Sequence, residues 1–285
     1  MQILDSVAPL VGRYRGFVLD IWGVVHDGQA AFPGVADALA RMKGAGARIC
    51  FLSNAPRRSH VVERQLAAFG IGRTLYDAAM TSGEITWRLL RDRAHPFVQG
   101  LGPRALHIGK PDDRSVVEEL GISLTDRVED ADWVLNTGPD PDRGVQTVEP
   151  YEALLGAALA RDLPMLCVNP DRHVVVGGRL IICAGALSER YARLGGRTLE
   201  IGKPDPAAYD PVMQLLDLPR GDCVAIGDSP HTDLAGALAA GLDAVWALGG
   251  LAAEEGLANA DSATLAARAK AEGVSPVAAL RGLRW

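Results

Sequence analysis

The amino-acid sequence predicts an α/β protein built from parallel sheets in two units. Short apolar runs, such as residues 17–19, alternate with segments that carry apolar residues at helical spacing, which is typical of βαβ units. The same alternation starts again after residues 95–102, which are rich in helix breakers. Polar residues follow several of the apolar runs directly. We therefore expect a parallel-sheet core interrupted by an inserted α/β unit.

The first part of the chain, up to about residue 95, fits a lead-in helix within residues 1–14 and three strand–helix pairs. Gly and Pro mark the ends of these elements: Pro33-Gly34 precedes the first helix of the pairs, and Gly70 closes the second. We expect strands at residues 17–19, 48–52 and 78–81, and helices at residues 35–43, 59–69 and 83–91.

The middle and the end of the chain continue the pattern. Residues 174–176 and 180–182, joined by Gly177-Gly178, predict a β-hairpin. The tail is rich in alanine and is expected to be mostly helical. We expect further strands at residues 105–108, 133–136, 164–168, 199–201, 223–226 and 244–248, and helices at residues 113–120, 150–160, 209–216 and 234–240.

Composition narrows the class of protein. A chain of 285 residues with 48% hydrophobic residues can fill one or two cores. Its net charge of −6 argues against nucleic acid or an acidic membrane as a partner. No apolar run approaches a membrane span or a secretory signal, so we expect a cytoplasmic protein. Whether it is a monomer or a homodimer stays open. The four cysteines, Cys50, Cys167, Cys183 and Cys223, lie singly in apolar runs and indicate reduced core residues.

Polar side chains follow the expected strands in the outer parts of the chain. Asp20 ends the first apolar run, Ser53-Asn54 ends the next, and Asp228 and Asp233 follow residues 223–226. Lys203 lies in the Gly-Lys-Pro segment after the middle unit. Each of these residues has a local explanation as a helix cap, a turn residue or a solvated charge. Ligands bind at the carboxyl ends of strands in open α/β sheets, so together they indicate a site.

The chemistry that needs these residue types is phosphoryl transfer. Its transition state spreads negative charge over the phosphoryl oxygens, so the protein must position the group and neutralise charge. Mg²⁺ prefers carboxylate oxygens, which Asp20 and Asp228 supply, and Lys203 offsets the clustered negative charge. An aspartate can also form a covalent phosphoaspartate.

These motifs resemble the haloacid dehalogenase (HAD) superfamily, in the order Asp20, Ser53-Asn54, Gly202-Lys203-Pro204 and Gly-Asp-Ser-Pro-His-Thr-Asp at residues 227–233. The Pro33-Gly34 step and the position of the insert resemble its class IIA, the NagD-like phosphatases. The resemblance implies a Rossmann-like core of residues 1–95 and 202–285. It further implies an inserted α/β cap of the C2 type at residues 96–201, which selects the substrate.

The resemblance also implies a magnesium site. Asp20 would be both nucleophile and metal ligand, and the backbone carbonyl of Trp22 would be a second ligand. Asp228 would be the third, with Asp233 supporting the site.

For the phosphoryl group, the resemblance implies binding by Ser53, Asn54 and Lys203, with Ser53 and Lys203 taking part in catalysis beside the nucleophile. Two segments resemble NagD-like caps, Asn169-Pro170-Asp171 and Ala184-Gly185-Ala186-Leu187. Of these, Asn169 and Asp171 are expected to contact the substrate.

One residue departs from the family pattern. Phosphatases of this superfamily usually carry an aspartate two residues after the nucleophile, as general acid and base, and this chain has Trp22. An indole cannot exchange that proton, and general acid–base assistance is worth on the order of 10² to 10⁴ in rate. Either another residue supplies the proton or the leaving group must be acidic. By sequence, His26 and Asp27 are the nearest candidates, although both also fit a turn.

Two alternative functions are consistent with these residues. The first is a Mg²⁺-dependent phosphatase that acts on a small phosphorylated metabolite through a phosphoaspartate on Asp20. The alternative is a catalytically weak regulatory protein that binds phosphate and metal and has lost turnover with Trp22. Retention of Asp20 favours the enzyme, because a protein that only binds phosphate needs no nucleophile.

Overall fold

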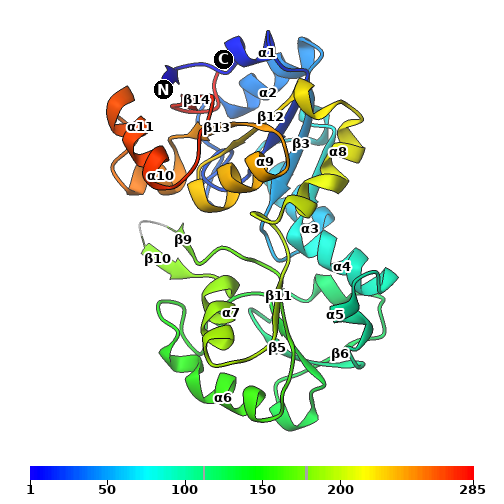
Figure 1. Ribbon diagram of the computed structural model, residues 1–285. Coiled ribbons are helices and arrows are strands. Elements are labelled where there is room, and N and C mark those ends of the chain that lie inside the picture. Colours follow the sequence, from blue (N-terminus) through cyan, green and yellow to red (C-terminus); the bar gives the residue numbers. More distant parts are fainter. Residues whose placement is uncertain (112, 177–178) are drawn as a thin grey trace.

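The main sheet of the protein has seven parallel strands in the order β1-β14-β13-β12-β2-β3-β4 (Figure 1). The structure is a computed structural model in which residues 1–111, 113–176 and 179–285 are described. The strands are β1 (Gln2–Leu4), β2 (Gly16–Leu19), β3 (Arg48–Ser53), β4 (Ala78–Thr81), β12 (Cys223–Gly227), β13 (Asp243–Ala247) and β14 (Ala278–Leu280). β2 is central and completely buried, because its side chains alternate between two apolar layers.

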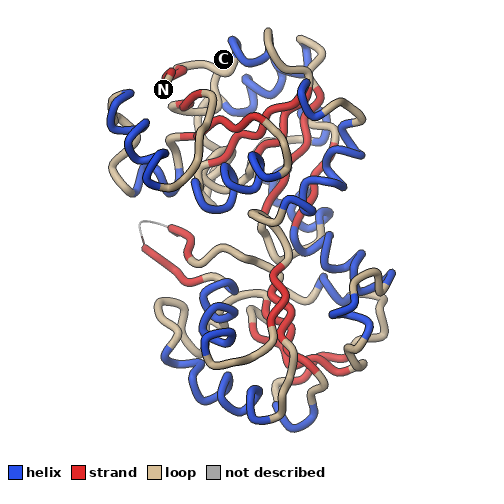
Figure 2. The backbone as a smooth tube through the Cα atoms, in the orientation of Figure 1, coloured by secondary structure: helices blue, strands red, loops and turns tan. Residues whose placement is uncertain are grey.

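Helices cover both faces of this sheet (Figure 2). Phe17 and Leu19 of β2 pack into one apolar layer and Val18 into the other. The first layer is completed by α1 (Ala8–Val11), α2 (Val35–Gly44) and α3 (Ser59–Ala68). The second is completed by α8 (Asp210–Leu216), α9 (Ala235–Ala239), α10 (Gly250–Glu254) and α11 (Ser262–Ala271). The resulting three layers are the predicted parallel α/β core.

A second sheet, of five parallel strands, has the order β11-β8-β7-β5-β6. Its strands are β5 (Arg104–Ile108), β6 (Ser123–Thr125), β7 (Trp133–Asn136), β8 (Met165–Cys167) and β11 (Thr198–Glu200). α6 (Glu152–Ala160) and α7 (Ala184–Arg193) pack on one face. The other face contacts α4 (Ser82–Asp92) through Leu90, and α5 (Pro96–Gln99) through Val98.

A separate β-hairpin lies between the two units. β9 (His173–Val176) and β10 (Arg179–Ile182) are antiparallel, as expected, and Figure 1 shows them between the second sheet and the core. The expected turn at Gly177-Gly178 lies outside the described residues. None of the described helices has the length and apolar character needed to span a bilayer.

Three sequence expectations were wrong in detail. The lead-in segment begins with strand β1, which pairs with β14 and makes residues 2–4 the edge of the main sheet. The tail likewise contributes β14 besides its helices. Residues 113–120 form a short 3-10 turn, Ser115–Val117, instead of a helix, because their apolar residues are a short run that packs under the second sheet. In all three places, pairing or packing with distant residues overrides the local pattern.

Candidate active site

The strand order brings the predicted site residues together. β12, β2 and β3 are neighbours in the sheet, so the segments that follow them meet at one edge. Asp20 follows β2, Ser53 ends β3, and Asp228 follows β12. All three residues are buried, at 4–9% exposed. The parallel sheet therefore places two carboxylates and a hydroxyl around one point.

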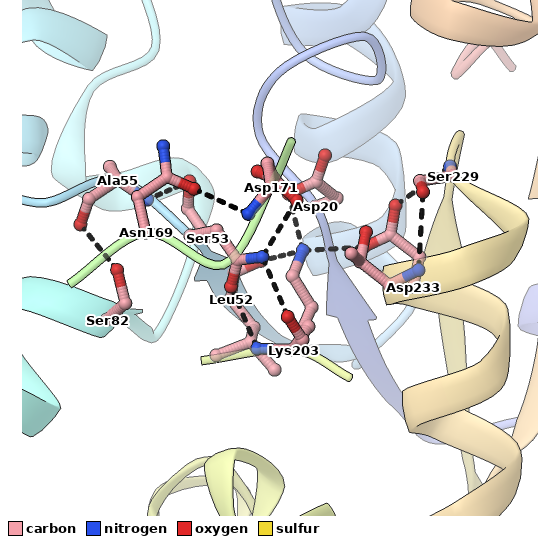
Figure 3. Close-up of polar contacts among 12 residues, drawn as sticks. Asp20, Leu52, Ser53, Ala55, Ser82, Asn169, Asp171, Lys203, Ser229 and Asp233 are labelled. Atoms are coloured by element: carbon pink, nitrogen blue, oxygen red, sulfur yellow. Dashed lines mark hydrogen bonds and ion pairs between the residues drawn. The ribbon is translucent and has the colours of Figure 1, made fainter. Parts of the chain in front are cut away.

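Lys203 lies at the centre of this group (Figure 3). Its Nζ donates to Asp20 Oδ1 at 2.7 Å, to Asp233 Oδ1 at 2.6 Å and to the Leu52 carbonyl at 2.9 Å. These bonds use all three donors of the ammonium group. Burial alone would lower the pKa of Lys203, but the charges of Asp20 and Asp233 raise it well above its usual range. The lysine is thus a fixed positive charge.

Asn54 binds the backbone of Lys203, where the chain re-enters the core after the second unit. Its Oδ1 accepts from the Lys203 backbone N–H at 2.8 Å, and its Nδ2 donates to the Lys203 carbonyl at 3.0 Å. The same Nδ2 donates to Asp171 Oδ1 of the second unit at 2.9 Å. Asn54 therefore fixes the lysine and holds a carboxylate from the inserted unit over the site.

The carboxylates destabilise one another when ionised. Burial raises the pKa of Asp20 to about 7, with the charges of Asp233 and Asp171 adding to the effect and Lys203 opposing it. Burial and the nearby charges of Asp20 and Asp233 also raise the pKa of Asp228 well above its usual range. A cation at this point would relieve the repulsion and favour the ionised forms.

The donor set fits a hard divalent cation. Asp20, Asp228 and Asp233 each offer an oxygen, and these atoms lie within 4.8 Å of one another. Both oxygens of Asp233 are already engaged, one by Lys203 and the other by the Ser229 N–H at 3.0 Å. Among the described residues, Asp20 Oδ2 and Asp228 Oδ1 accept no hydrogen bond, and neither does the Trp22 carbonyl. Those three oxygens suit Mg²⁺, with Asp233 as support.

Two cavities that share some wall residues lie at this edge of the sheet. The smaller one, about 50 Å³, is lined by Asp20, Trp22, Ser53, Asn54, Asp171, Lys203, Asp228 and Asp233, among others. The larger one, about 330 Å³, lies between the core and the second unit and has mostly apolar walls. Asn169 lines only the larger cavity, and its Oδ1 accepts from the Asp171 N–H at 3.0 Å. The other predicted site residues meet in the smaller cavity.

Trp22 forms a wall shared by both cavities. Its indole Nε1 donates to the Val175 carbonyl of β9 at 3.3 Å, which links the core to the hairpin. The ring packs edge-on against His26 and lies against Gly28, where a Cβ atom would collide with the indole. Gly28 also has φ +89°, a conformation that favours glycine. The loop after β2 is therefore built around this tryptophan.

Replacing Trp22 with phenylalanine should weaken closure of the second unit. The ring would stay, but the hydrogen bond to Val175 would be lost, at a cost of about 0.5 to 1.5 kcal/mol. We expect KM for an aryl phosphate to rise by roughly two- to tenfold, with kcat less affected. Steady-state kinetics measures this, and Trp285→Phe, an exposed tryptophan at the chain end, is the matched control. An unchanged KM would show that the hydrogen bond between Trp22 and Val175 does not stabilise the closed arrangement of the two units.

His26 and Asp27, the candidates nearest in sequence for the missing acid, do not line the smaller cavity. His26 is buried, and its Nδ1 accepts from the Gly28 N–H at 2.9 Å, so the proton is on Nε2. Burial lowers the pKa of His26, which favours a neutral ring that donates protons poorly. Asp27 accepts from the Ala30 and Gln29 N–H groups, which lower its pKa. Both residues form the turn after β2.

Several residues that line the two cavities could not be identified from the sequence. His173 and Val174 of the hairpin face the smaller cavity, and Arg57 of the core pairs with Asp113 of the second unit beside the larger one. Their local sequence resembles an ordinary strand and two ordinary surface charges. Only the contact between the two units gives these residues a place in the site.

Comparisons with known proteins agree with this geometry. The family profile described as "Haloacid dehalogenase-like hydrolase" matches residues 17–123, and a second profile of HAD-like hydrolases matches residues 200–271. A solved structure of a haloacid dehalogenase-like hydrolase from Brucella suis 1330 is 32% identical, with a TM-score of 0.83. The match covers 98% of this chain and 99% of that one. The chain belongs to the haloacid dehalogenase-like family of hydrolases.

Two further relatives narrow the class. Chronophin from Bos taurus is 28% identical over 268 residues, which is 88% of this chain and 86% of chronophin. The glycerol phosphate phosphatase of Mycobacterium tuberculosis, solved in complex with calcium, is 25% identical with a TM-score of 0.63. That match covers 85% of this chain and 68% of the phosphatase. This chain is accordingly a phosphatase-like hydrolase.

Proposed function

We propose that the protein is a Mg²⁺-dependent phosphatase that acts on a small phosphorylated metabolite through a phosphoaspartate on Asp20. The observation that carries this proposal is the position of Asp20, which lines the smaller cavity with its carboxylate held at Oδ1 by Lys203. A carboxylate whose orientation is fixed in this way can direct one oxygen at phosphorus while the other oxygen is left for the cation.

The other residues of the smaller cavity receive the phosphoryl group. We assign the Ser53 hydroxyl to a hydrogen bond with its oxygens and Lys203 to neutralising its charge. Asn54 would support phosphoryl binding by holding Lys203 and Asp171, because these two residues take both donors of its amide. Lys203 also opposes protonation of Asp20, because its buried ammonium lowers the pKa of the carboxyl against the larger effect of burial. Asn169 and Asp171 would contact the substrate from the second unit.

Mg²⁺ would be held by Asp20, Asp228 and the Trp22 carbonyl, with Asp233 holding the lysine and the Ser229 turn in place. When bound, the ion would neutralise charge on the transferring group. Gly23 permits this arrangement, because a Cβ there would collide with the Asp228 carboxylate.

We further propose the division into a catalytic core of residues 1–95 and 202–285 and a cap of residues 96–201. The two separate sheets support it, and so does Ile201, which still packs with the second sheet. The larger cavity between the units would then hold the leaving group. A cytoplasmic location and the choice between monomer and homodimer stay predictions.

Asp228→Asn should separate metal binding from folding. In the wild type, Mg²⁺ should raise the thermal unfolding midpoint and should be required for turnover of 4-nitrophenyl phosphate. In the variant we expect both effects to be reduced strongly, because one of two charged ligands is lost. Differential scanning fluorimetry with and without MgCl₂, beside a turnover assay, measures this. Asp243→Asn, a carboxylate outside both cavities, should respond to Mg²⁺ like the wild type.

The same turnover assay distinguishes the phosphatase from the regulatory alternative. Turnover that requires Mg²⁺ and Asp20 would exclude a protein that only binds phosphate and metal. A sugar phosphate beside 4-nitrophenyl phosphate then tests the leaving group. Turnover of the nitrophenyl ester alone would mean that leaving-group protonation is missing, whereas comparable rates would mean that another residue supplies the proton.

A further inference from the structure

The structure restricts where a proton donor for the leaving group can stand. In the proposed reaction Asp20 attacks phosphorus in the smaller cavity and the larger cavity holds the leaving group, so the departing oxygen would lie where the two cavities share wall residues. A general acid must be within hydrogen-bond reach of that oxygen. It must therefore belong to the residues that line both cavities. Of the described residues, five do so: Trp22, Ser53, Asn54, Asp171 and Val174.

Only one of these five carries a side chain of the kind that serves as a general acid and base. An indole, a serine hydroxyl, an amide and an alkyl side chain do not serve in this way, whereas the carboxyl of Asp171 can. We propose that Asp171, contributed by the inserted unit, is the general acid and base that replaces the aspartate missing at Trp22. This inference rests on the proposed phosphatase function.

The carboxyl of Asp171 is held in place from both units. Asn54 Nδ2 donates to its Oδ1 at 2.9 Å, and the Asn169 side chain fixes its backbone N–H. Figure 3 shows Asp171 next to Asp20, and its charge is one of those that raise the pKa of Asp20. Strand β9 begins two residues after Asp171, and the Trp22 indole donates to the carbonyl of Val175 in that strand.

The environment also favours a carboxyl that can carry a proton. Burial raises the pKa of Asp171, although Lys203 and the hydrogen bond from Asn54 oppose the shift. This is the direction that a general acid requires, because a carboxyl with its ordinary pKa is ionised at neutral pH.

The proposed reaction balances in two steps. In the first, a carboxylate oxygen of Asp20 bonds to phosphorus, the bond from phosphorus to the leaving oxygen breaks, and that oxygen takes the proton of Asp171. In the second, a water oxygen attacks the phosphorus of phosphoaspartate while giving a proton to the Asp171 carboxylate. The aspartyl–phosphate bond breaks, phosphate is released, and both aspartates return to their starting states.

The test is the leaving-group dependence of Asp171→Asn. Asparagine is nearly the same size and keeps an oxygen that can accept from Asn54, so the contact between the units can persist. The probes are 4-nitrophenyl, phenyl and benzyl phosphate, which have similar shapes but increasingly basic leaving groups. We expect kcat/KM to fall less than about tenfold for the nitrophenyl ester and by on the order of 10² to 10⁴ for the benzyl ester.

His173→Gln is the matched control, since His173 is a titratable side chain that lines the smaller cavity only. It should keep the wild-type ratio of benzyl to nitrophenyl turnover. An equal loss on all three esters in Asp171→Asn would overturn the proposal, because a residue that only binds or closes the cap affects every substrate alike. Steepening in His173→Gln instead would also overturn it.

The proposed phosphatase function and the proposed role of Asp171 can be rejected separately. Wild-type turnover of 4-nitrophenyl phosphate that survives Asp20→Asn would reject the proposed function and this inference together. Asp20-dependent turnover with an unchanged leaving-group dependence in Asp171→Asn would reject only the role of Asp171.

Discussion

Replacing Asp20 with asparagine is expected to abolish phosphatase turnover, with kcat falling on the order of 10⁴-fold or more. An amide cannot form the phosphoaspartate, so the first chemical step is lost. The variant should fold normally, because asparagine can still accept from Lys203 and one member of a repelling carboxylate cluster is neutralised. Acid quenching with a ³²P-labelled substrate should trap label on the wild type and not on the variant.

The matched control is Asp27→Asn, seven residues along the chain. Asp27 caps a turn, is exposed and lines neither cavity, so its variant should retain wild-type labelling and turnover. Covalent label that persists in Asp20→Asn would identify another nucleophile and contradict the proposed mechanism.

Replacing Lys203 with methionine should lower both stability and turnover. Lys203 is 3% exposed and binds two carboxylates and a carbonyl, so its removal leaves uncompensated buried charge. Breaking a buried ion pair from one side typically costs about 3 to 5 kcal/mol. We expect a loss of that size in the free energy of unfolding, measured by urea denaturation without Mg²⁺. Turnover should fall as well, because the phosphoryl group loses its fixed cation.

Lys43→Met is the comparison for this prediction. Lys43 pairs with Asp77 at 2.6 Å, but the two side chains are 27% and 32% exposed, so the pair should contribute no more than about 1 kcal/mol. A double variant, Lys203→Met with Asp20→Asn, should regain part of the lost stability, since one unpaired charge is removed. Equal destabilisation by the two lysine substitutions would show that burial of the Lys203 network contributes little.

Most of the fold could be predicted from the sequence, because a strand buried on both faces leaves a strong local pattern. Phe17 to Leu19 is a continuous apolar run, and the structure places it at the centre of the main sheet. The expectations failed where the local pattern is weak. Gln2 to Leu4 is an edge strand of three residues, held by pairing with β14 at the other end of the chain. The sequence around residues 2–4 contains no signal for a strand partner at the other end of the chain.

The sequence by itself determined the residue types of the site and the strand ends that carry them. Asp20, Ser53 and Asp228 were identifiable because each follows an apolar run, and parallel strands bring their carboxyl ends to one edge. What only the tertiary structure decided is how the inserted unit meets that edge. Asn54 bonding to Asp171 and Trp22 bonding to Val175 join residues more than 100 positions apart. Such contacts depend on the packing of two separately formed units, and neither unit's local sequence encodes the distance between them.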